Sequence, residues 1–135
     1  MILVVALDDH GGMMFNRRRQ SKDRALRLDL LQTIGSNRLW MNDYSAKQFE
    51  LPLDPRITIS ADYLAEAGPG DYCFVEEEFP SHFLSKVEGL VIYRWNRIYP
   101  KDVIFQIPLA PWALVDTREF TGYSHDKITK EVYTK

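Results

Sequence analysis

The chain has 135 residues, of which 45% are hydrophobic, and its net charge of −2 results from 17 basic and 19 acidic residues. This size and composition exclude overall disorder and predict a single soluble domain over residues 1–135. No apolar run approaches the roughly 20 residues that a membrane helix needs, and the apolar N-terminus is too short for a signal peptide. A single cysteine, Cys73, excludes an internal disulfide or a thiolate zinc site. We therefore expect a cytoplasmic protein without membrane contact.

The first third of the chain reads as strand, loop and helix. Residues Met1–Leu7 form a continuous apolar run that is typical of a strand buried on both faces. Residues 8–16 contain two glycines and predict a loop. Ser21 is expected to be the N-cap of an amphipathic helix over 22–34, with Asp23 in its first turn, where the helix dipole favours a carboxylate.

The rest of the chain alternates between short strands and short helices before ending in strands alone. This alternation predicts an α/β domain with a mixed, mainly parallel central sheet, helices on both faces and an antiparallel C-terminal extension. The predicted strands are 38–41, 56–60, 72–75, 90–95, 103–107, 112–116 and 128–133, and the predicted helical segments are 45–49, 61–67 and 80–87.

This order of elements resembles dihydrofolate reductase. The segments that carry the resemblance are Met1–Asp8, Arg38–Met41, Leu51–Pro52 with Arg56–Ser60, Phe83–Lys86 with Gly89–Tyr93, and Asp102–Phe105 ahead of Trp112. The resemblance covers most of the chain and implies the fold of that family. It also implies a functional carboxyl in the first helix, for which Asp23 is the counterpart.

The motifs that bind the cofactor in that family are replaced in this chain. Where the family has a Gly-Arg-x-Thr/Ser turn for the cofactor phosphates, this sequence has Asn42-Asp43-Tyr44-Ser45. Where the family has a Gly-Gly turn beside the diphosphate, it has Val75-Glu76-Glu77-Glu78. Three carboxylates near two phosphates would repel them, so we do not expect NADPH as a cofactor, and the chain is predicted to be a non-reductase.

The candidate site lies where the parallel strands end, because ligands bind at the carboxyl ends of strands in open α/β sheets. The most basic stretch, residues 17–27 with six basic and one acidic residue, lies nearby in the predicted topology. One or two of its arginines can clamp a phosphate or carboxylate. The predicted ligand is small and anionic or nucleotide-like, Asp23 is the candidate acid/base group, and the predicted ligand-binding residues are Asp8, Arg17, Arg18, Arg19, Gln20, Ser21, Asn42, Tyr44, Ser45, Trp95 and Asn96.

Other readings of the same features stay open. The basic run 17–27 and the acidic run 76–78 can be contacts for a protein partner, and the basic run with Trp95 can bind single-stranded nucleic acid. Asp8 and its neighbours can serve metal or acid/base chemistry, or can simply be polar loop residues. Ser124 and His125 are adjacent, but a catalytic Ser–His pair needs spatial contact and an orienting acid, so turn chemistry is the expectation there. Whether any reaction is catalysed is left open.

Overall fold

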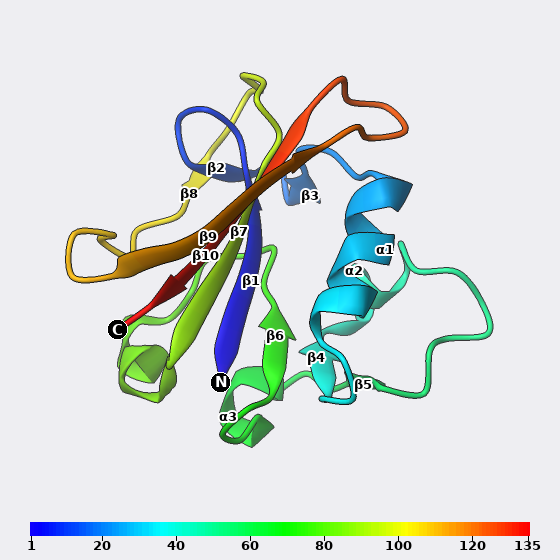
Figure 1. Ribbon diagram of the computed structural model, residues 1–135. Coiled ribbons are helices and arrows are strands. Elements are labelled where there is room, and N and C mark those ends of the chain that lie inside the picture. The colour runs from blue at the N-terminus through cyan, green and yellow to red at the C-terminus, as the bar shows by residue number, and fades with distance from the viewer.

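The computed structural model describes residues 1–135, and a seven-stranded mixed sheet crosses it (Figure 1). Its strands, in spatial order, are β5 (Ile57–Ile59), β4 (Leu39–Met41), β6 (Tyr72–Phe74), β1 (Ile2–Leu7), β7 (Gly89–Arg94), β10 (Ile128–Thr134) and β9 (Ala113–Phe120). The first five run parallel, and β10 pairs antiparallel with both β7 and β9. The predicted fold class, including the antiparallel C-terminal extension, is confirmed.

A second, smaller sheet corrects two predictions. β2 (Gly12–Phe15) lies between β3 (Arg18–Arg19) and β8 (Val103–Ile104), so 8–16 is not simply a loop and 103–107 does not join the main sheet. Gly11 has a φ of +75°, and the Asp8 carboxylate accepts the N–H of Gly12 at 2.8 Å. The chain therefore turns sharply after β1, and Gly12–Phe15 pair with β3 and β8 in the second sheet.

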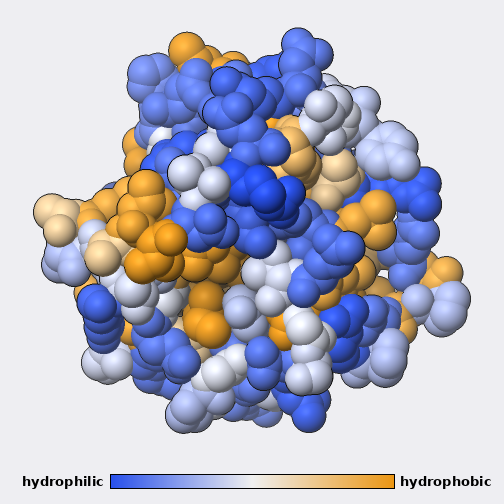
Figure 2. Space-filling model, in the orientation of Figure 1, coloured by the Kyte–Doolittle hydropathy of each residue, from blue (hydrophilic) through white to orange (hydrophobic).

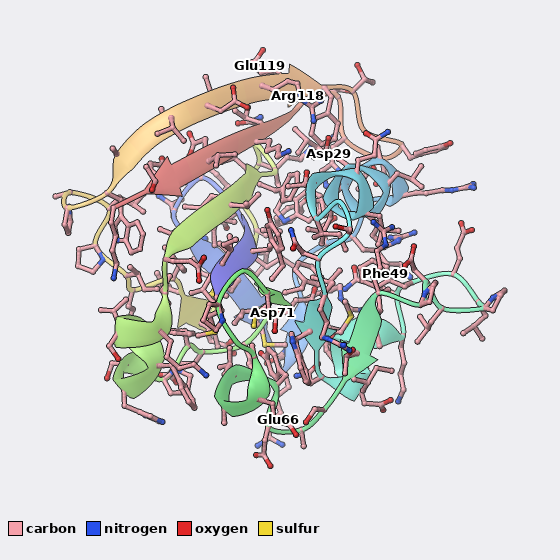
Figure 3. The ribbon with its side chains drawn as sticks, turned by 60° about the horizontal axis from the view of Figure 1, so that its bottom comes forward. Asp29, Phe49, Glu66, Asp71, Arg118 and Glu119 are labelled. Carbon is pink, nitrogen blue, oxygen red and sulfur yellow. The ribbon has the colours of Figure 1, made fainter.

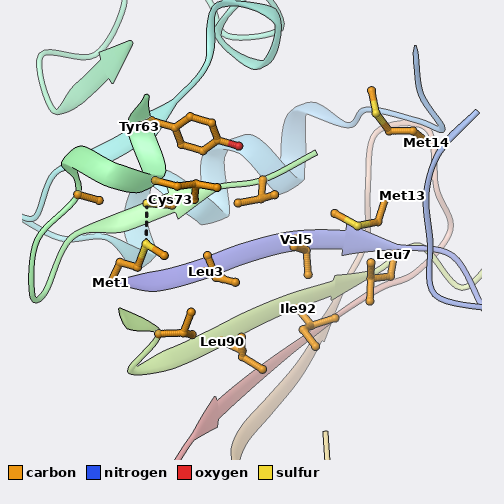
Figure 4. Packing of buried hydrophobic residues seen from close by; sticks show 14 residues of the cluster. Met1, Leu3, Val5, Leu7, Met13, Met14, Tyr63, Cys73, Leu90 and Ile92 are labelled. Carbon is orange, nitrogen blue, oxygen red and sulfur yellow. Dashed lines mark hydrogen bonds between the residues drawn. The ribbon is translucent and has the colours of Figure 1, made fainter. Parts of the chain in front are cut away.

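Helices cover both faces of the main sheet, and the alternation of side chains along β1 explains how. Leu3, Val5 and Leu7 point to one face and pack with residues of α3 (Tyr63–Glu66), while Val4 points to the other face and packs with α1 (Arg24–Thr33). Figure 4 shows the first of these two cores, in which Cys73 donates its thiol hydrogen to the Met1 sulfur at 3.6 Å. Both faces of β1 are buried, as its continuous apolar run predicted.

The helix starts differ from the predicted ones. Asp23, not Ser21, is the N-cap of α1, because its Oδ1 accepts the N–H of Ala25 at 2.8 Å. Asn42 caps α2 (Asp43–Ala46), which begins two residues before the predicted position. Residues Ser81–Lys86, labelled η1, form a 3-10 helix and not the α-helix expected over 80–87. The sequence patterns therefore predicted where the helical segments lie, but the residue that caps α1 depends on contacts with distant parts of the chain.

On the face that Figure 2 shows, hydrophobic side chains at the surface are interrupted by hydrophilic ones. None of the helices combines the length and apolar character that crossing a lipid bilayer requires.

Candidate functional site

Four parallel strands of the main sheet end at the same edge. β1 is followed by Asp8, β4 by Asn42, β6 by Val75 and β7 by Trp95. The β2–β3 hairpin contacts this edge, since the backbone N–H of Arg19 donates to the Tyr44 hydroxyl at 2.9 Å. Of the basic segment 17–27, the hairpin residues therefore lie at the strand ends, whereas Arg24 and Arg27 line a different pocket.

A bidentate ion pair between Arg19 and Glu76 occupies the middle of this edge. The Arg19 Nε lies 2.9 Å from one carboxylate oxygen of Glu76, and Nη2 lies 3.2 Å from the other. The side chains are only 17% and 10% exposed. Glu76 also accepts hydrogen bonds from Ser45 Oγ at 2.8 Å and from Gln48 Nε2 at 3.0 Å. The Arg19 guanidinium stacks 4.2 Å above the Tyr44 ring, so its position is fixed on all sides.

This ion pair bears on the cofactor that the resemblance implies. The turns 42–45 and 75–78 do come together, because Ser45 bonds to Glu76 and Asn42 Nδ2 donates to Glu77 at 3.3 Å. Arg19 and Glu76 occupy the part of the space between the turns that is next to Ser45, and neither turn contains a glycine. A diphosphate placed there would have to displace a satisfied ion pair and approach two carboxylates. The residues present do not fit the diphosphate of NADPH.

Two pockets flank the hairpin, and neighbouring arginines line different ones. The pocket of ≈ 460 Å³, which we call the Arg17 pocket, is lined by Met14, Arg17, Asn42, Tyr44, Glu77, Asp102 and Val103. The pocket of ≈ 430 Å³, which we call the Arg18 pocket, is lined by Phe15, Asn16, Arg18, Arg19, Gln20, Tyr99 and Pro100. Asn16 and Arg17 have φ angles of 52° and 62°, and this left-handed turn separates the two guanidinium groups. Both are exposed, and neither belongs to an ion pair, unlike the Arg19 guanidinium.

Asp8 holds the loops of this edge together. Its side chain is fully buried and lies 2.9 Å from Lys101 Nζ. Burial acts to raise the pKa of Asp8, but the contact with Lys101 and three backbone N–H groups outweigh it and lower the pKa to about 2. The N–H groups belong to His10, Gly12 and Tyr99. Gln20 Nε2 also donates to Asp8, at 3.1 Å. With its oxygens engaged and buried, Asp8 supports the site and has no exposed face for the predicted ligand contact.

Trp95 and Asn96 also differ from the sequence prediction. Trp95 is 3% exposed and stacks on the His125 ring with a centroid distance of 4.4 Å, so it belongs to the core and not to a cleft. Asn96 donates from Nδ2 to Lys127 O and to Thr129 Oγ1, both at 3.0 Å. These bonds join the end of β7 to the start of β10. Within the alternating segment 93–99, the side chains of Tyr93 and Trp95 pack in the core.

A cluster that sequence reasoning missed surrounds His125. Its Nδ1 lies 2.9 Å from Asp23 Oδ2, and its Nε2 lies 3.0 Å from both Ser21 Oγ and the Tyr99 hydroxyl. Burial acts to raise the pKa of Asp23, but hydrogen bonds from His125 and from backbone N–H groups outweigh it, and the pKa lies well below its ordinary value. Asp23 is 3% exposed and does not line a cleft. Ser124–His125 was the only sequence signal, since Ser21 lies 104 positions away from His125.

Two further pockets lie outside the predicted site. One of ≈ 210 Å³ between α1 and the segment 49–57 contains Arg24, Arg27, Glu50 and Asp54 among apolar side chains, and Arg24 pairs with Glu50 at 3.1 Å. The other, of ≈ 230 Å³, lies between η1 and the segment 104–108 and is mostly apolar. No three side chains of the His, Cys, Asp and Glu types are grouped closely enough to hold a metal ion.

Comparison with known proteins identifies the fold. No protein-family model and no curated protein sequence matches the chain. Among solved structures, the dihydrofolate reductase from Enterococcus faecalis complexed with NADP(H) and RAB-propyl is similar, with a TM-score of 0.66 over 98% of this chain and 94% of that chain. The two sequences share only 12% identity, so the likeness concerns the fold alone. This chain has a divergent dihydrofolate reductase-like fold.

Proposed function

We propose that this protein binds a small anionic or nucleotide-like ligand in the Arg17 pocket and is not an NADPH-dependent reductase. The observation that carries the proposal is an exposed arginine without an ion-pair partner at a pocket on the carboxyl edge of the sheet. This edge is where open α/β sheets bind ligands. The filled space around Arg19 and Glu76 supports the second half of the proposal, because it opposes a diphosphate.

The lining of the Arg17 pocket suggests the chemistry of its ligand. Arg17 offers a planar guanidinium for one phosphate or carboxylate group. Glu77 and Asp102 contribute carboxylate oxygens, which accept hydrogen bonds from amino or hydroxyl groups. One cation beside two carboxylates disfavours a polyanion. The pocket therefore suits a ligand with a single anionic group and several hydrogen-bond donors, of which a nucleoside monophosphate is an example.

Thermal unfolding against a ligand panel tests the proposal. The panel comprises nucleoside monophosphates, sugar phosphates, dihydrofolate, NADPH and short single-stranded oligonucleotides. A ligand at about 100 times its dissociation constant stabilises the fold by about 2.7 kcal/mol, which raises the Tm by several degrees. We expect a shift with a monophosphate and none with NADPH. A shift with NADPH, or no shift with any anion, contradicts the proposal.

Two variants make the test specific to one pocket. Arg17→Ala removes the only cation of the Arg17 pocket, so the shift should disappear. Arg18→Ala removes a neighbouring exposed arginine that lines the other pocket, so the shift should remain. Loss of the shift in both variants would indicate a general effect of positive charge and not binding in this pocket.

The alternative functions receive less support from the geometry. A nucleic-acid surface that uses Trp95 lacks its stacking platform, because that side chain is buried. A protein contact that uses the acidic run loses Glu76, which is paired with Arg19. The oligonucleotides in the panel keep the first alternative testable, because charge-driven binding would weaken steeply with added salt.

A further inference from the structure

Ser21, His125 and Asp23 lie in the order that activates a serine nucleophile. The Ser21 hydroxyl contacts one imidazole nitrogen at 3.0 Å, and the Asp23 carboxylate contacts the other at 2.9 Å. In hydrolases that use such a triad, the imidazole takes the proton of the serine while the carboxylate orients the imidazole. A catalytic pair needs a serine in contact with the histidine and an acid that orients the histidine. Here Ser21, and not Ser124, makes the contact with His125 Nε2, and Asp23 is the acid.

Asp23 is held firmly as a carboxylate. Its oxygens accept the backbone N–H groups of Ala25 at 2.8 Å, Tyr123 at 3.0 Å and Ser124 at 2.9 Å. A charged Asp23 requires a hydrogen on His125 Nδ1, since that nitrogen faces the carboxylate. In the neutral ring that carries this hydrogen, the lone pair is on Nε2, toward Ser21. Stacking against Trp95 fixes the plane of the ring.

We propose that Ser21 is a nucleophile for acyl transfer from a small carboxylic ester, with His125 as its general base and Asp23 as the residue that positions His125. This activity is independent of ligand binding in the Arg17 pocket. Ser21 is partly exposed, whereas His125 and Asp23 are buried, which is the arrangement that lets a substrate reach the nucleophile alone.

The Arg18 pocket adjoins this cluster and is the site assigned to the ester, although Ser21 itself is not one of its lining residues. Gln20, which precedes Ser21 in the chain, lines this pocket. Tyr99 also lines it, and the Tyr99 hydroxyl is the second hydroxyl in contact with His125 Nε2. Only one hydroxyl can donate to that lone pair at a time. When Ser21 donates, the Tyr99 hydroxyl is free to donate to the oxygen that becomes negative.

The reaction needs only water as a co-reactant. Ser21 Oγ bonds to the carbonyl carbon of the ester as its proton moves to His125 Nε2. The bond to the alcohol oxygen then breaks, and the departing alcohol takes the proton from Nε2. Water, deprotonated by the same nitrogen, attacks the acyl group on Ser21, which releases the acid and restores the serine hydroxyl.

Labelling of the unaltered protein is the first test. A fluorophosphonate probe reacts with activated serines, so after incubation the mass of the peptide that contains Ser21 should increase by one phosphonyl group. Ser124 provides an internal control, because it is more exposed but contacts the Nδ1 side of His125, 3.2 Å away, where no lone pair is available. No label on Ser21, or equal labels on Ser21 and Ser124, overturns the proposal.

A pair of cysteine variants gives a readout that is independent of any ester. The natural thiol, Cys73, is buried, and burial raises its pKa to about 12, so it contributes little to alkylation. In Ser21→Cys, the thiol meets the lone pair of His125 Nε2, whereas in Ser124→Cys it meets Nδ1–H. We expect iodoacetamide to alkylate Ser21→Cys faster, on the order of tenfold, because the thiolate is the reactive species.

Folding of the two cysteine variants is measured separately from their alkylation. Circular dichroism and the Tm of both variants establish that each is folded before alkylation is compared. Equal alkylation rates in two folded variants overturn the activation of Ser21. If either variant fails to fold, labelling of the unaltered chain still decides. A monophosphate shift without label on Ser21 would leave the Arg17 pocket intact and remove only this second activity.

Discussion

At the scale of single residues, the ionisation of Asp8 should make the free energy of unfolding depend on pH in the acid range. Its pKa falls from 3.8 to about 2 on folding, which corresponds to about 2 kcal/mol of unfolding free energy. Because the folded pKa is the lower one, this stability is present above about pH 4 and is lost as the pH falls toward 2.

Asp8→Asn should therefore lower the free energy of unfolding at neutral pH and flatten its dependence on pH between about 4 and 2. Urea unfolding at several pH values measures both effects. Asp9→Asn is the matched control, since Asp9 is exposed and adjacent. A pH dependence in Asp8→Asn equal to that of the unaltered protein would contradict the role assigned to Asp8.

Arg19 and Glu76 should be energetically coupled. A double-mutant cycle of Arg19→Ala and Glu76→Ala is expected to give a coupling energy of about 1–3 kcal/mol, because the pair is bidentate and largely shielded from water. The same cycle with Arg18→Ala should give no coupling with Glu76. Coupling near zero in both cycles would mean that the pair fills space without contributing energy.

The residue scale is also where sequence reasoning succeeded least. Arg17, Asn42 and Tyr44 do share a pocket, and the order of the parallel strands predicted the place of Asn42 and Tyr44. The burial of Asp8 and Trp95 could not be predicted, since their partners Lys101 and His125 approach from loops far along the chain. The local sequence shows that a side chain is polar or aromatic, but it does not show whether a distant residue will bind and bury that side chain.

At the scale of elements, the loop between β9 and β10 has no room at Gly122. A Cβ built there lies 2.6 Å from Asp23 Oδ2 and 2.9 Å from the backbone oxygen of His125. Gly122→Ala must therefore move the loop away from the start of α1. We expect it to destabilise the protein by about 1–3 kcal/mol and to reduce labelling of Ser21.

Gly68→Ala is the matched control for this loop. Its Cβ would have only one neighbour, an Asp71 oxygen at 3.7 Å, which is an ordinary contact. In calorimetry, Gly122→Ala should have a lower Tm than Gly68→Ala. In fluorophosphonate labelling, Ser21 should be labelled less in Gly122→Ala than in Gly68→Ala. Full labelling in a destabilised Gly122→Ala would show that the loop does not position His125.

Long apolar strands were easier to predict than helix starts for a physical reason. Runs such as 90–95 are apolar whatever their partners are, so β7 was predicted to within one residue at each end. The start of α1 depends on whether Ser21 or Asp23 caps it, and the Ser21 hydroxyl is engaged by His125. Capping is thus decided by tertiary contacts when two capable side chains stand close together.

At the scale of the whole molecule, Asp29 joins α1 to the antiparallel end of the sheet. It is 8% exposed, accepts the Tyr93 hydroxyl hydrogen at 2.6 Å, lies 3.4 Å from Lys130 Nζ and pairs with Arg118. Figure 3 shows Asp29 on the helix directed toward Arg118 on β9. One carboxylate on α1 therefore contacts side chains of β7, β9 and β10.

Asp29→Ala should lower the free energy of unfolding by about 3–5 kcal/mol, because it removes the carboxylate from the buried Tyr93 hydroxyl and from Lys130, whose side chain is only 11% exposed. Equilibrium unfolding in urea measures the loss. Asp43→Ala on α2 is the control, since Asp43 pairs with Lys47 in full contact with solvent and should leave stability nearly unchanged. Similar losses in the two variants would show that Asp29 does not link the elements energetically.

The central position of β1 has a consequence for synthesis of the chain on the ribosome. β1 is made well before its two neighbours in the sheet, which begin at Tyr72 and Gly89. The most hydrophobic strand therefore remains exposed at both edges and on both faces until synthesis has passed Tyr72, where its first partner strand begins. During that interval it is a target for chaperones and for aggregation, and the newly made chain is more vulnerable than the finished fold.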